Sequence, residues 1–261
     1  MQIIASHTFL IERHALTLSF PHSTYFGPST TVTDTFRPSA TVEDYLKALY
    51  SLEQRGHDKV RIKDMAELMD VSLPSVTTMM KSLAEQDFVQ RTAYRGVCLT
   101  EDGKLAALKV IRKHRLVEAF LIEVLGYTWD EVHEEAERLE HAMSDTLTDR
   151  IDQYLGFPRF DPHGDPIPSA DGTIEKPTTQ TLIEAPQQRP LSVQRVTDQS
   201  TEVLQYLGER GIQPGATLSI ERVDPFDGPI WIKLDDQEIV LSRTLAHRVL
   251  VDQPNARTRK A

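Results

Sequence analysis

The stretch RIKDMAELMDVSLPSVTTMMKSLAE, residues 61–85, decides the fold of this protein. Its first part, residues 61–69, has apolar side chains at helical spacing and contains no glycine or proline. A tight turn is predicted at residues 70–72, and Ser72 can cap a second helix that tolerates Pro74 in its first turn. A short helix, a tight turn and a second helix form the pattern of a helix-turn-helix.

The second predicted helix, residues 73–85, has two chemically different faces. Its larger apolar side chains turn inward, whereas small polar and basic side chains turn outward. Such an outer face can enter the major groove of DNA, where side chains contact base edges and phosphates. We expect base contacts from Ser72, Pro74 and Thr78. We expect phosphate contacts from Ser75, Thr77 and Lys81.

Residues 88–100 predict a β-hairpin, because two short runs of strand-forming residues flank a turn. Such a hairpin is the wing of a winged helix, and Arg91 and Arg95 are placed in it to contact phosphates. A winged helix-turn-helix DNA-binding domain is therefore predicted for residues 39–110. The segment leaves one alternative open, which is a winged helix that binds another protein instead of DNA.

A second informative stretch is HEEAERLEH, residues 133–141, which is predicted to be helical. Residues three and four apart share a helix face, which groups His133, Glu137, Glu140 and His141. A buried face of this kind needs a partner, because buried charges are paired or bind metal. Its mixed nitrogen and oxygen ligands suit a divalent first-row metal without selecting one. An exposed acidic face explains the same pattern, and this stretch alone does not decide between the two.

Two amphipathic helices are predicted around this stretch. Residues 109–125 carry His114 and Glu118 on one face, and residues 130–154 form a second helix that contains the acidic stretch. Both helices bury more apolar surface when they pair with a second copy of the chain, so we expect a homodimer. A helical dimerisation and metal-binding domain is predicted for residues 111–156.

Charge is distributed unevenly along the chain, whose net charge is −10. Residues 61–115 carry 10 Lys and Arg against 7 Asp and Glu, whereas residues 116–175 carry 3 Arg against 15 acids. The net charge excludes a uniformly basic coat for nucleic acid. A mildly basic segment followed by a strongly acidic one indicates two functions, the second of which can be cation binding.

Cysteine content and hydropathy bound the class of protein. Cys98 is the only cysteine, which excludes an intramolecular disulfide and a zinc site built from several cysteines. No apolar run reaches the length of a membrane helix, and residues 1–18 do not have the pattern of a signal peptide. We therefore expect a cytoplasmic protein with no membrane partner.

The rest of the chain is expected to form a β-rich end and two tails. Residues 157–190 are rich in proline and glycine and predict a linker. Residues 191–252 contain short alternating runs separated by turns, which predict a small β-barrel. Residues 1–38 are expected to be a disordered N-terminal extension, and residues 253–261 a basic tail. The expected fold class is mainly α with a β-rich end.

Six short motifs, in this order, resemble the diphtheria-toxin-repressor and manganese-transport-regulator family of bacterial metal-dependent repressors. The motifs are EDYL (43–46), SLPSVT (72–77), RKHRLVE (112–118), EHAMSD (140–145), FP (157–158) and GDPIP (164–168). The resemblance covers the chain from residue 40 to residue 251. It implies a winged helix-turn-helix domain, a helical dimerisation and metal-binding domain, and a C-terminal SH3-like (FeoA-like) barrel.

The resemblance also implies a primary metal site. Its ligands map onto Asp44, His114, Glu137, Glu140 and His141. Iron-type members carry Met and Cys where this chain has Asp44 and Glu137, and the harder oxygen donors favour Mn²⁺. Manganese-type members with two metals in one cluster use an acid where this chain has Lys47, which lowers the odds of that arrangement.

A second, ancillary metal site is implied by the three-domain members of the family. Its ligands map onto Glu118, His133 and Asp198, together with His114, which both sites claim. Glu202 is a rival to Asp198 as the ligand from the barrel.

The function that the resemblance implies is a metal-dependent transcriptional regulator that represses metal-uptake genes. Its cofactor is expected to be Mn²⁺, with Fe²⁺ as the alternative, and its partners double-stranded operator DNA and a second copy of the chain. No small organic substrate and no enzymatic activity are expected. A metallohydrolase is the alternative from another class, since HEEAE at residues 133–137 comes near H-E-x-x-H, with Glu137 in place of the second histidine.

Overall fold

The structure is a computed structural model that describes residues 38–56, 59–92 and 96–252. Apart from Pro38, the predicted N-terminal extension and the predicted basic tail lie outside the described residues, and so does Arg95. None of the described helices combines the length and the apolar character needed to cross a membrane.

The predicted helix-turn-helix is confirmed by two consecutive helices, α2 (Ile62–Met69) and α3 (Leu73–Glu85). Asp70 has a φ of 52°, a left-handed conformation that ends α2 and turns the chain. Ser72 caps α3, because its Oγ accepts a hydrogen bond from the backbone N–H of Ser75 at 3.3 Å. The turn therefore depends on neighbouring residues, and it could be predicted from the sequence.

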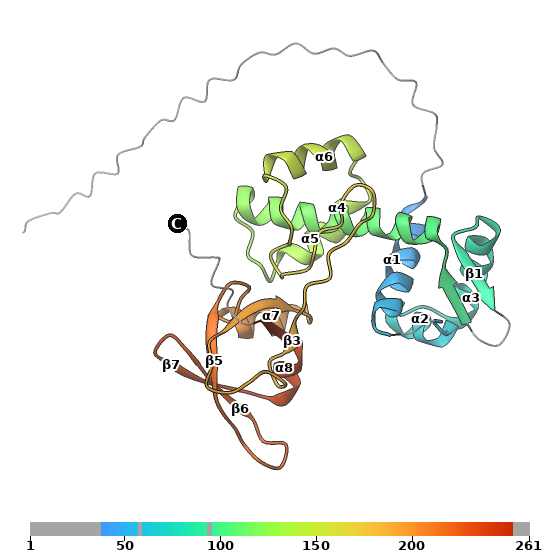
Figure 1. Ribbon diagram of the computed structural model, residues 1–261. Coiled ribbons are helices and arrows are strands. Elements are labelled where there is room, and N and C mark those ends of the chain that lie inside the picture. The colour runs from blue at the N-terminus through green and yellow to red at the C-terminus, as the bar shows by residue number, and fades with distance from the viewer. Residues whose placement is uncertain (1–37, 57–58, 93–95, 253–261) are drawn as a thin grey trace, which may run out of the picture. The chain divides into compact units, whose positions relative to one another are not determined.

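A further helix and a β-hairpin complete the winged helix. They are α1 (Ala40–Gln54), β1 (Val89–Thr92) and β2 (Gly96–Leu99), with the two strands antiparallel (Figure 1). A Cβ on Gly96 would lie 2.4 Å from the carbonyl oxygen of Val60, and the φ of Gly96 is +106°. Only glycine fits this start of β2, where Val60 and Val97 exchange backbone hydrogen bonds.

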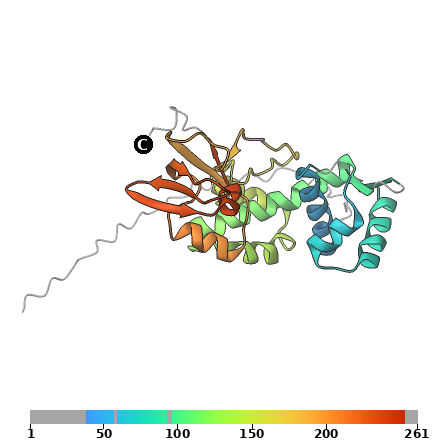
Figure 2. The same cartoon turned by 90° about the horizontal axis from the view of Figure 1, so that it is seen from below.

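Helix α4 (Glu101–Leu125) belongs to two apolar cores. Its first half, including Ala107 and Ile111, packs into the core of the winged helix. Its second half, including Leu116 and Leu121, packs into the core of the following helices. Figures 1 and 2 show α4 in green as one uninterrupted helix. It therefore connects the helix-turn-helix to the helical domain without a flexible joint.

The single helix predicted over residues 130–154 is wrong. The chain forms α5 (Val132–Glu140) and α6 (Asp145–Tyr154), separated by a short turn. Ser144 has an extended backbone, with φ −77° and ψ 156°, and its Oγ accepts a hydrogen bond from Leu147 N–H. An apolar stripe runs through both helices, so periodicity alone missed the serine cap that starts a new helix. The break leaves His141 at the C-terminal end of α5.

The C-terminal region is a six-stranded antiparallel sheet with two short helices. Its strand order is β3-β8-β4-β5-β6-β7. The strands are β3 (Gln180–Thr181), β4 (Leu191–Val196), β5 (Thr217–Val223), β6 (Ile230–Leu234), β7 (Gln237–Leu241) and β8 (Val249–Asp252). The helices are α7 (Thr201–Gly208) and α8 (Arg243–Arg248).

This sheet encloses its own core of aliphatic side chains, among them Val193, Leu207 and Ile232. The strands predicted between residues 191 and 241 are present, whereas β3, α8 and β8 were not anticipated. Strand β8 pairs with both β3 and β4, so it lies between these two strands in the sheet. This pairing joins strands that are distant in the chain, so it could not be predicted from local sequence patterns.

Candidate metal centre and DNA-binding surface

The first candidate metal cluster joins α1 to the end of α5. Asp44, Glu140 and His141 each offer a ligand atom, and these atoms lie within 4.8 Å of one another. The Nε2 atom of His141 is 2.9 Å from Asp44 Oδ1 and 3.4 Å from Glu140 Oε1. We call these three residues the α1–α5 cluster. Asp44 comes from the DNA-binding domain, and the other two come from the helical domain.

Lys47, one turn after Asp44 on α1, sets the charge at this cluster. Its Nζ lies 2.9 Å and 3.0 Å from the two carboxylate oxygens of Glu140, and 3.4 Å from His114 Nδ1. Burial by itself raises the pKa of Glu140, but hydrogen bonds from His114 and the charge of Lys47 outweigh it and leave the pKa below its usual value. Glu140, at 1% exposure, is thus held as a carboxylate in the metal-free protein.

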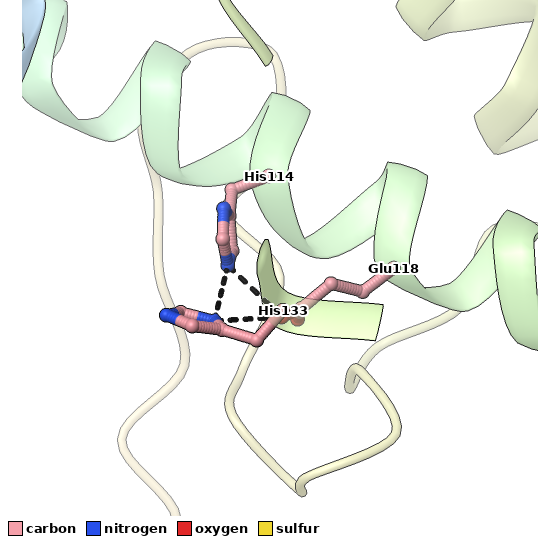
Figure 3. A group of neighbouring side chains, drawn as sticks. All are labelled: His114, Glu118 and His133. Atoms are coloured by element: carbon pink, nitrogen blue, oxygen red, sulfur yellow. Dashed lines mark hydrogen bonds and ion pairs between the residues drawn. The ribbon is translucent and has the colours of Figure 1, made fainter. Parts of the chain in front are cut away.

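A second cluster lies further along α4 and contains His114, Glu118 and His133 (Figure 3). The Oε1 atom of Glu118 is 2.9 Å from His114 Nε2 and 3.1 Å from His133 Nδ1, and these two ring nitrogens are 3.1 Å apart. His114 also lies 2.6 Å from Glu140 through its Nδ1. Each ring nitrogen of His114 therefore faces a different carboxylate.

The pKa of His114 reflects this double contact. Burial by itself lowers the pKa of the imidazole. The hydrogen bonds with Glu118 and Glu140 have the larger effect and raise the pKa from 6.5 to about 9. The imidazolium form is consequently the stable form of His114 near neutral pH in the metal-free protein.

A third cluster combines Glu118 with Asp161 and His163, from the segment predicted to be a linker. All three side chains are buried, and Glu118 Oε2, Asp161 Oδ2 and His163 Nδ1 have no hydrogen-bond partner within the described residues. His163 Nε2 lies 2.7 Å from the carbonyl oxygen of Trp129, which orients the ring and leaves Nδ1 facing Glu118 at 3.6 Å. Unsatisfied buried oxygen and nitrogen atoms that converge in this way fit a divalent cation.

The electrostatics of this third cluster agree with its geometry. Burial, followed by the charges of Asp165 and Glu118, raises the pKa of Asp161 to about 7. The pKa of Glu118 moves the opposite way: burial raises it, but the hydrogen bonds with His114 and His133 and the nearby imidazole of His163 bring it well below its usual value. Without a cation, the cluster thus tends to keep a proton on Asp161.

Asp161 and His163 were not predicted as ligands from the sequence. Both lie in a segment whose proline and glycine content predicted a linker, and linker side chains are usually exposed. The available signal was the pattern Asp161-Pro-His163, directly before the GDPIP motif that carried part of the resemblance.

Other predicted ligands lie outside these clusters. Glu137 is 55% exposed, with Oε1 3.5 Å from Lys47 Nζ and 3.7 Å from His133 Nε2. Asp198 accepts hydrogen bonds from the backbone and hydroxyl of Ser200, and it belongs to none of the three clusters found among the described residues. Glu202, its rival, lies in the first turn of α7 and is likewise in none of them.

Glu134, the general base of the hydrolase alternative, also lies apart from the clusters. Its side chain is 74% exposed and pairs with Arg138 at 3.7 Å. A general base must be within hydrogen-bond reach of the proton that it abstracts, so this geometry does not favour the hydrolase reading.

The predicted DNA-contacting side chains share the outer face of α3. A recognition helix needs polar side chains that are accessible to DNA. Five of the six predicted residues are exposed and Thr77 is half-buried; the exposed ones are Ser72, Pro74, Ser75, Thr78 and Lys81. The hydroxyls of Thr77 and Thr78 donate to the carbonyl oxygens of Leu73 and Pro74, so toward DNA they can accept a hydrogen bond from a base amino group. The phosphate contact expected of Thr77 would require its hydroxyl hydrogen to turn away from Leu73. Arg91 is exposed on β1 of the wing. Arg95, the other wing residue predicted to contact a phosphate, falls outside the described residues.

A winged helix-turn-helix joined by a rigid helix to clusters of carboxylates and imidazoles defines a metal-responsive DNA-binding protein. Three family models match the chain. The iron dependent repressor N-terminal DNA binding domain matches residues 38–97, the iron dependent repressor metal binding and dimerisation domain residues 100–169, and the FeoA domain residues 180–253.

Relatives of known function match along nearly their whole length. The iron-dependent repressor IdeR of Mycobacterium tuberculosis (strain ATCC 25618 / H37Rv) is 32% identical, over 82% of this chain and 97% of the relative. The diphtheria toxin repressor of Corynebacterium diphtheriae (biotype gravis) is 31% identical over the same shares of 82% and 97%. A solved structure described as a manganese-dependent transcriptional repressor in complex with manganese is 39% identical, covers 81% of this chain and 99% of its own, and has a TM-score of 0.74.

The chain therefore belongs to the diphtheria-toxin-repressor and manganese-transport-regulator family of metal-dependent transcriptional repressors. The resemblance and the expected three-part fold class are confirmed. The protein is a metal-dependent transcriptional repressor with a DNA-binding domain and a dimerisation domain. The relatives include both iron-dependent and manganese-dependent repressors.

Proposed function

We propose that this protein represses metal-uptake genes in response to Mn²⁺, and that it does so as a homodimer on double-stranded operator DNA. One observation carries the proposal: the α1–α5 cluster joins Asp44 of the DNA-binding domain to Glu140 and His141 of the helical domain. A ligand bound there touches both domains, and can therefore favour one arrangement of the two recognition helices.

The chemistry of the donors supports Mn²⁺. The cluster offers carboxylate oxygens and an imidazole nitrogen, and the single cysteine of the chain, Cys98, lies on β2 in the wing. Oxygen and nitrogen donors without a thiolate suit Mn²⁺, whereas sulfur donors would shift the preference toward softer ions. Fe²⁺ remains the alternative, because the two ions are neighbours in the affinity series.

In the metal-free protein, repulsion between carboxylates weakens the contact between α1 and α5. Asp44 on α1 faces the carboxylate of Glu140, and Lys47 offsets part of the negative charge. A divalent cation held by Asp44, Glu140 and His141 would supply the remaining positive charge. The consequence for the chain is that α1, which packs on α2 and α4, holds the helix-turn-helix in a fixed orientation to the dimer. Two recognition helices fixed in this way fit successive major grooves, about 34 Å apart or a multiple of it.

We also propose that Glu118, Asp161 and His163 hold a second cation. The alternative group of His114, Glu118 and His133 already satisfies its own hydrogen bonds at 2.9–3.1 Å. The atoms that converge between Glu118, Asp161 and His163 have only longer contacts of 3.6 Å, from His163 Nδ1 to Glu118 Oε2 and from Arg115 Nε to Asp161 Oδ2. A buried set whose atoms lack close hydrogen bonds gains more from a cation than a set that is already hydrogen-bonded.

The test of the proposed function is DNA binding as a function of metal. Duplexes selected by the protein from a random pool would be titrated, with fluorescence anisotropy as the readout, at matched free concentrations of Mn²⁺ and Fe²⁺ and in chelator. We expect tight binding in Mn²⁺ and weak binding in chelator. Equal affinity in chelator and in metal would contradict the proposal, and a clear preference for Fe²⁺ would overturn the choice of manganese.

A further inference from the structure

Glu43 is a buried carboxylate that lies beside the α1–α5 cluster and is not one of its three members. It lies in the first turn of α1, directly before Asp44, and only 6% of the residue is exposed. Its Oε2 atom is 2.6 Å from Nδ1 of His141. A buried carboxylate is stable only when it is paired, and His141 supplies the partner.

The two nitrogens of His141 face two successive residues of α1. Nδ1 faces Glu43 at 2.6 Å, while Nε2 faces Asp44 at 2.9 Å and Glu140 at 3.4 Å. A carboxylate accepts a hydrogen bond, so the short contact to Glu43 places a hydrogen on Nδ1. Asp44 and Glu140 can accept a hydrogen from Nε2 as well, but the contact to Glu43 is the shorter one. In neutral imidazole the hydrogen therefore stays on Nδ1, and Nε2 presents its lone pair to a cation held by the cluster.

We propose that Glu43 is a positioning residue for His141: it fixes the tautomer and the ring orientation that present Nε2 to the metal. The inference rests on the proposed metal site formed by Asp44, Glu140 and His141. A carboxylate that accepts the far N–H of a metal-binding imidazole also makes the ligand nitrogen more basic.

The position of Glu43 gives it a second consequence. Glu43 and Asp44 are neighbours on α1, and both contact the same ring at the end of α5. The ring of His141 is therefore held from one helix at both of its nitrogens. Loss of Glu43 removes one of these two ties between the DNA-binding domain and the helical domain, and leaves the ring free to rotate away from the cluster.

The first test measures Mn²⁺ affinity of the full-length protein from the electron paramagnetic resonance signal of free Mn²⁺. Glu43→Ala should weaken binding by about 10-fold to 100-fold, the usual cost of losing such a partner. Glu43→Gln should weaken it less, because the amide oxygen still accepts the Nδ1–H of His141. The rescue by glutamine separates positioning from simple loss of charge.

Glu53 supplies the matched control on the same helix. Its Oε1 accepts a hydrogen bond from the backbone N–H of Leu99 at 2.8 Å. Glu53→Gln therefore removes a carboxylate charge from α1, keeps an oxygen that can accept this hydrogen bond, and does not touch the cluster. We expect Glu53→Gln to bind Mn²⁺ as the unsubstituted protein does. Circular dichroism and thermal unfolding would establish that each variant is folded.

The second test reads the tautomer directly in metal-free protein. Long-range ¹H–¹⁵N correlation spectra of ¹⁵N-histidine-labelled protein distinguish the two neutral tautomers, and a His141→Gln variant assigns the signal. At a pH where His141 is neutral, we expect the Nδ1–H tautomer in the unsubstituted protein and a shift toward Nε2–H in Glu43→Ala.

The two tests separate the inference from the function on which it rests. If the unsubstituted protein binds no Mn²⁺, or if the Asp44→Ala variant binds Mn²⁺ with the same affinity as the unsubstituted protein, the proposed metal site is wrong. If the site binds Mn²⁺ but Glu43→Ala leaves both the affinity and the tautomer unchanged, the role assigned to Glu43 is wrong.

Discussion

At the scale of single residues, His114 and Lys47 are the cations of the metal-free clusters. The Nζ of Lys47 and the Nδ1 of His114 both contact Glu140 at 3.0 Å or less, and His114 also contacts Glu118. Glu140 and Glu118 therefore each have a positively charged partner before any metal arrives. These pairs stabilise the buried charges of the metal-free protein. We therefore expect its free energy of unfolding to depend on pH and on substitution of His114 and Lys47.

The first prediction concerns the pH dependence of metal-free stability. The pKa of His114 is raised from 6.5 to about 9, so its contribution is complete below pH 6.5 and is lost as the pH rises through 9. The lost contribution is about 3 kcal/mol. We expect the free energy of unfolding of the unsubstituted protein, relative to His114→Gln, to fall by that amount between pH 6.5 and 9. Urea denaturation at several pH values measures it, and a constant difference would contradict the prediction.

The second prediction concerns Lys47, whose side chain is 23% exposed and contacts the buried carboxylate of Glu140. Lys47→Gln should lower the free energy of unfolding of the metal-free protein by about 2 kcal/mol, because it leaves a buried charge with weaker compensation. Saturating Mn²⁺ should restore part of the loss. Lys63→Gln is the control, since Lys63 pairs with Glu67 on the surface of α2 and such pairs contribute about 0.5 kcal/mol or less. Equal effects of the two substitutions would argue against the role of Lys47.

At the scale of elements, α3 carries the predicted DNA-contacting side chains and α4 connects the two packed domains. Helix α3 presents exposed polar side chains, and α4 runs from the core of the winged helix into the core of the helical domain. A helix that is buried at both ends transmits orientation, because its bending would disturb two packed cores. The chemistry of DNA contact can therefore be changed on α3 without altering the metal clusters.

The third prediction follows from that separation. Lys81 is exposed on α3 and is expected to contact a phosphate. Lys81→Gln should weaken DNA binding by a similar factor on all sequences and reduce the slope of log affinity against log salt by about 1. Salt titrations of DNA binding with saturating Mn²⁺ measure both effects. A change in the preferred sequence, without a change in the slope, would instead assign Lys81 to base contact.

At the scale of the whole molecule, the segment between the helices and the sheet is a structural part of the centre. Arg115 of α4 contacts Asp165 at 3.1 Å, and Arg195 of β4 contacts the same carboxylate at 2.6 Å. Asp161 and His163 are buried beside them against Glu118. The third cluster thus forms where the helical domain, this segment and the sheet meet.

The fourth prediction tests this third cluster through Asp161, whose pKa is raised to about 7. Asp161→Asn should remove one bound Mn²⁺ per subunit, as measured by mass spectrometry of metal content after gel filtration. In metal-free protein at pH 8 the same substitution should raise the free energy of unfolding, on the order of 3 kcal/mol, because ionised Asp161 is destabilised by burial and by neighbouring carboxylates. An unchanged metal content would remove Asp161 from the list of ligands.

Much of the fold was legible in the sequence, because the relevant signals are local. The cap at Ser72, the turn-forming residues before it and the alternating strands of residues 191–241 each depend on neighbours in the chain. The break between α5 and α6 was missed because the apolar stripe continues across it, and β3 and β8 were missed because their pairing joins residues far apart in the chain.

The sequence by itself determined the class of protein and the types of ligand. Motifs at residues 72–77 and 112–118 are local patterns of residue type, and they led to a repressor with carboxylate and imidazole ligands. Only the tertiary structure decided which ligands meet. Glu43, Asp161 and His163 acquire a role through residues that are distant in the chain. Asp161 and His163 meet Glu118 across 43 and 45 positions, and Glu43 meets His141 across 98. Burial and unsatisfied atoms arise only when distant segments pack, so no local pattern could reveal them.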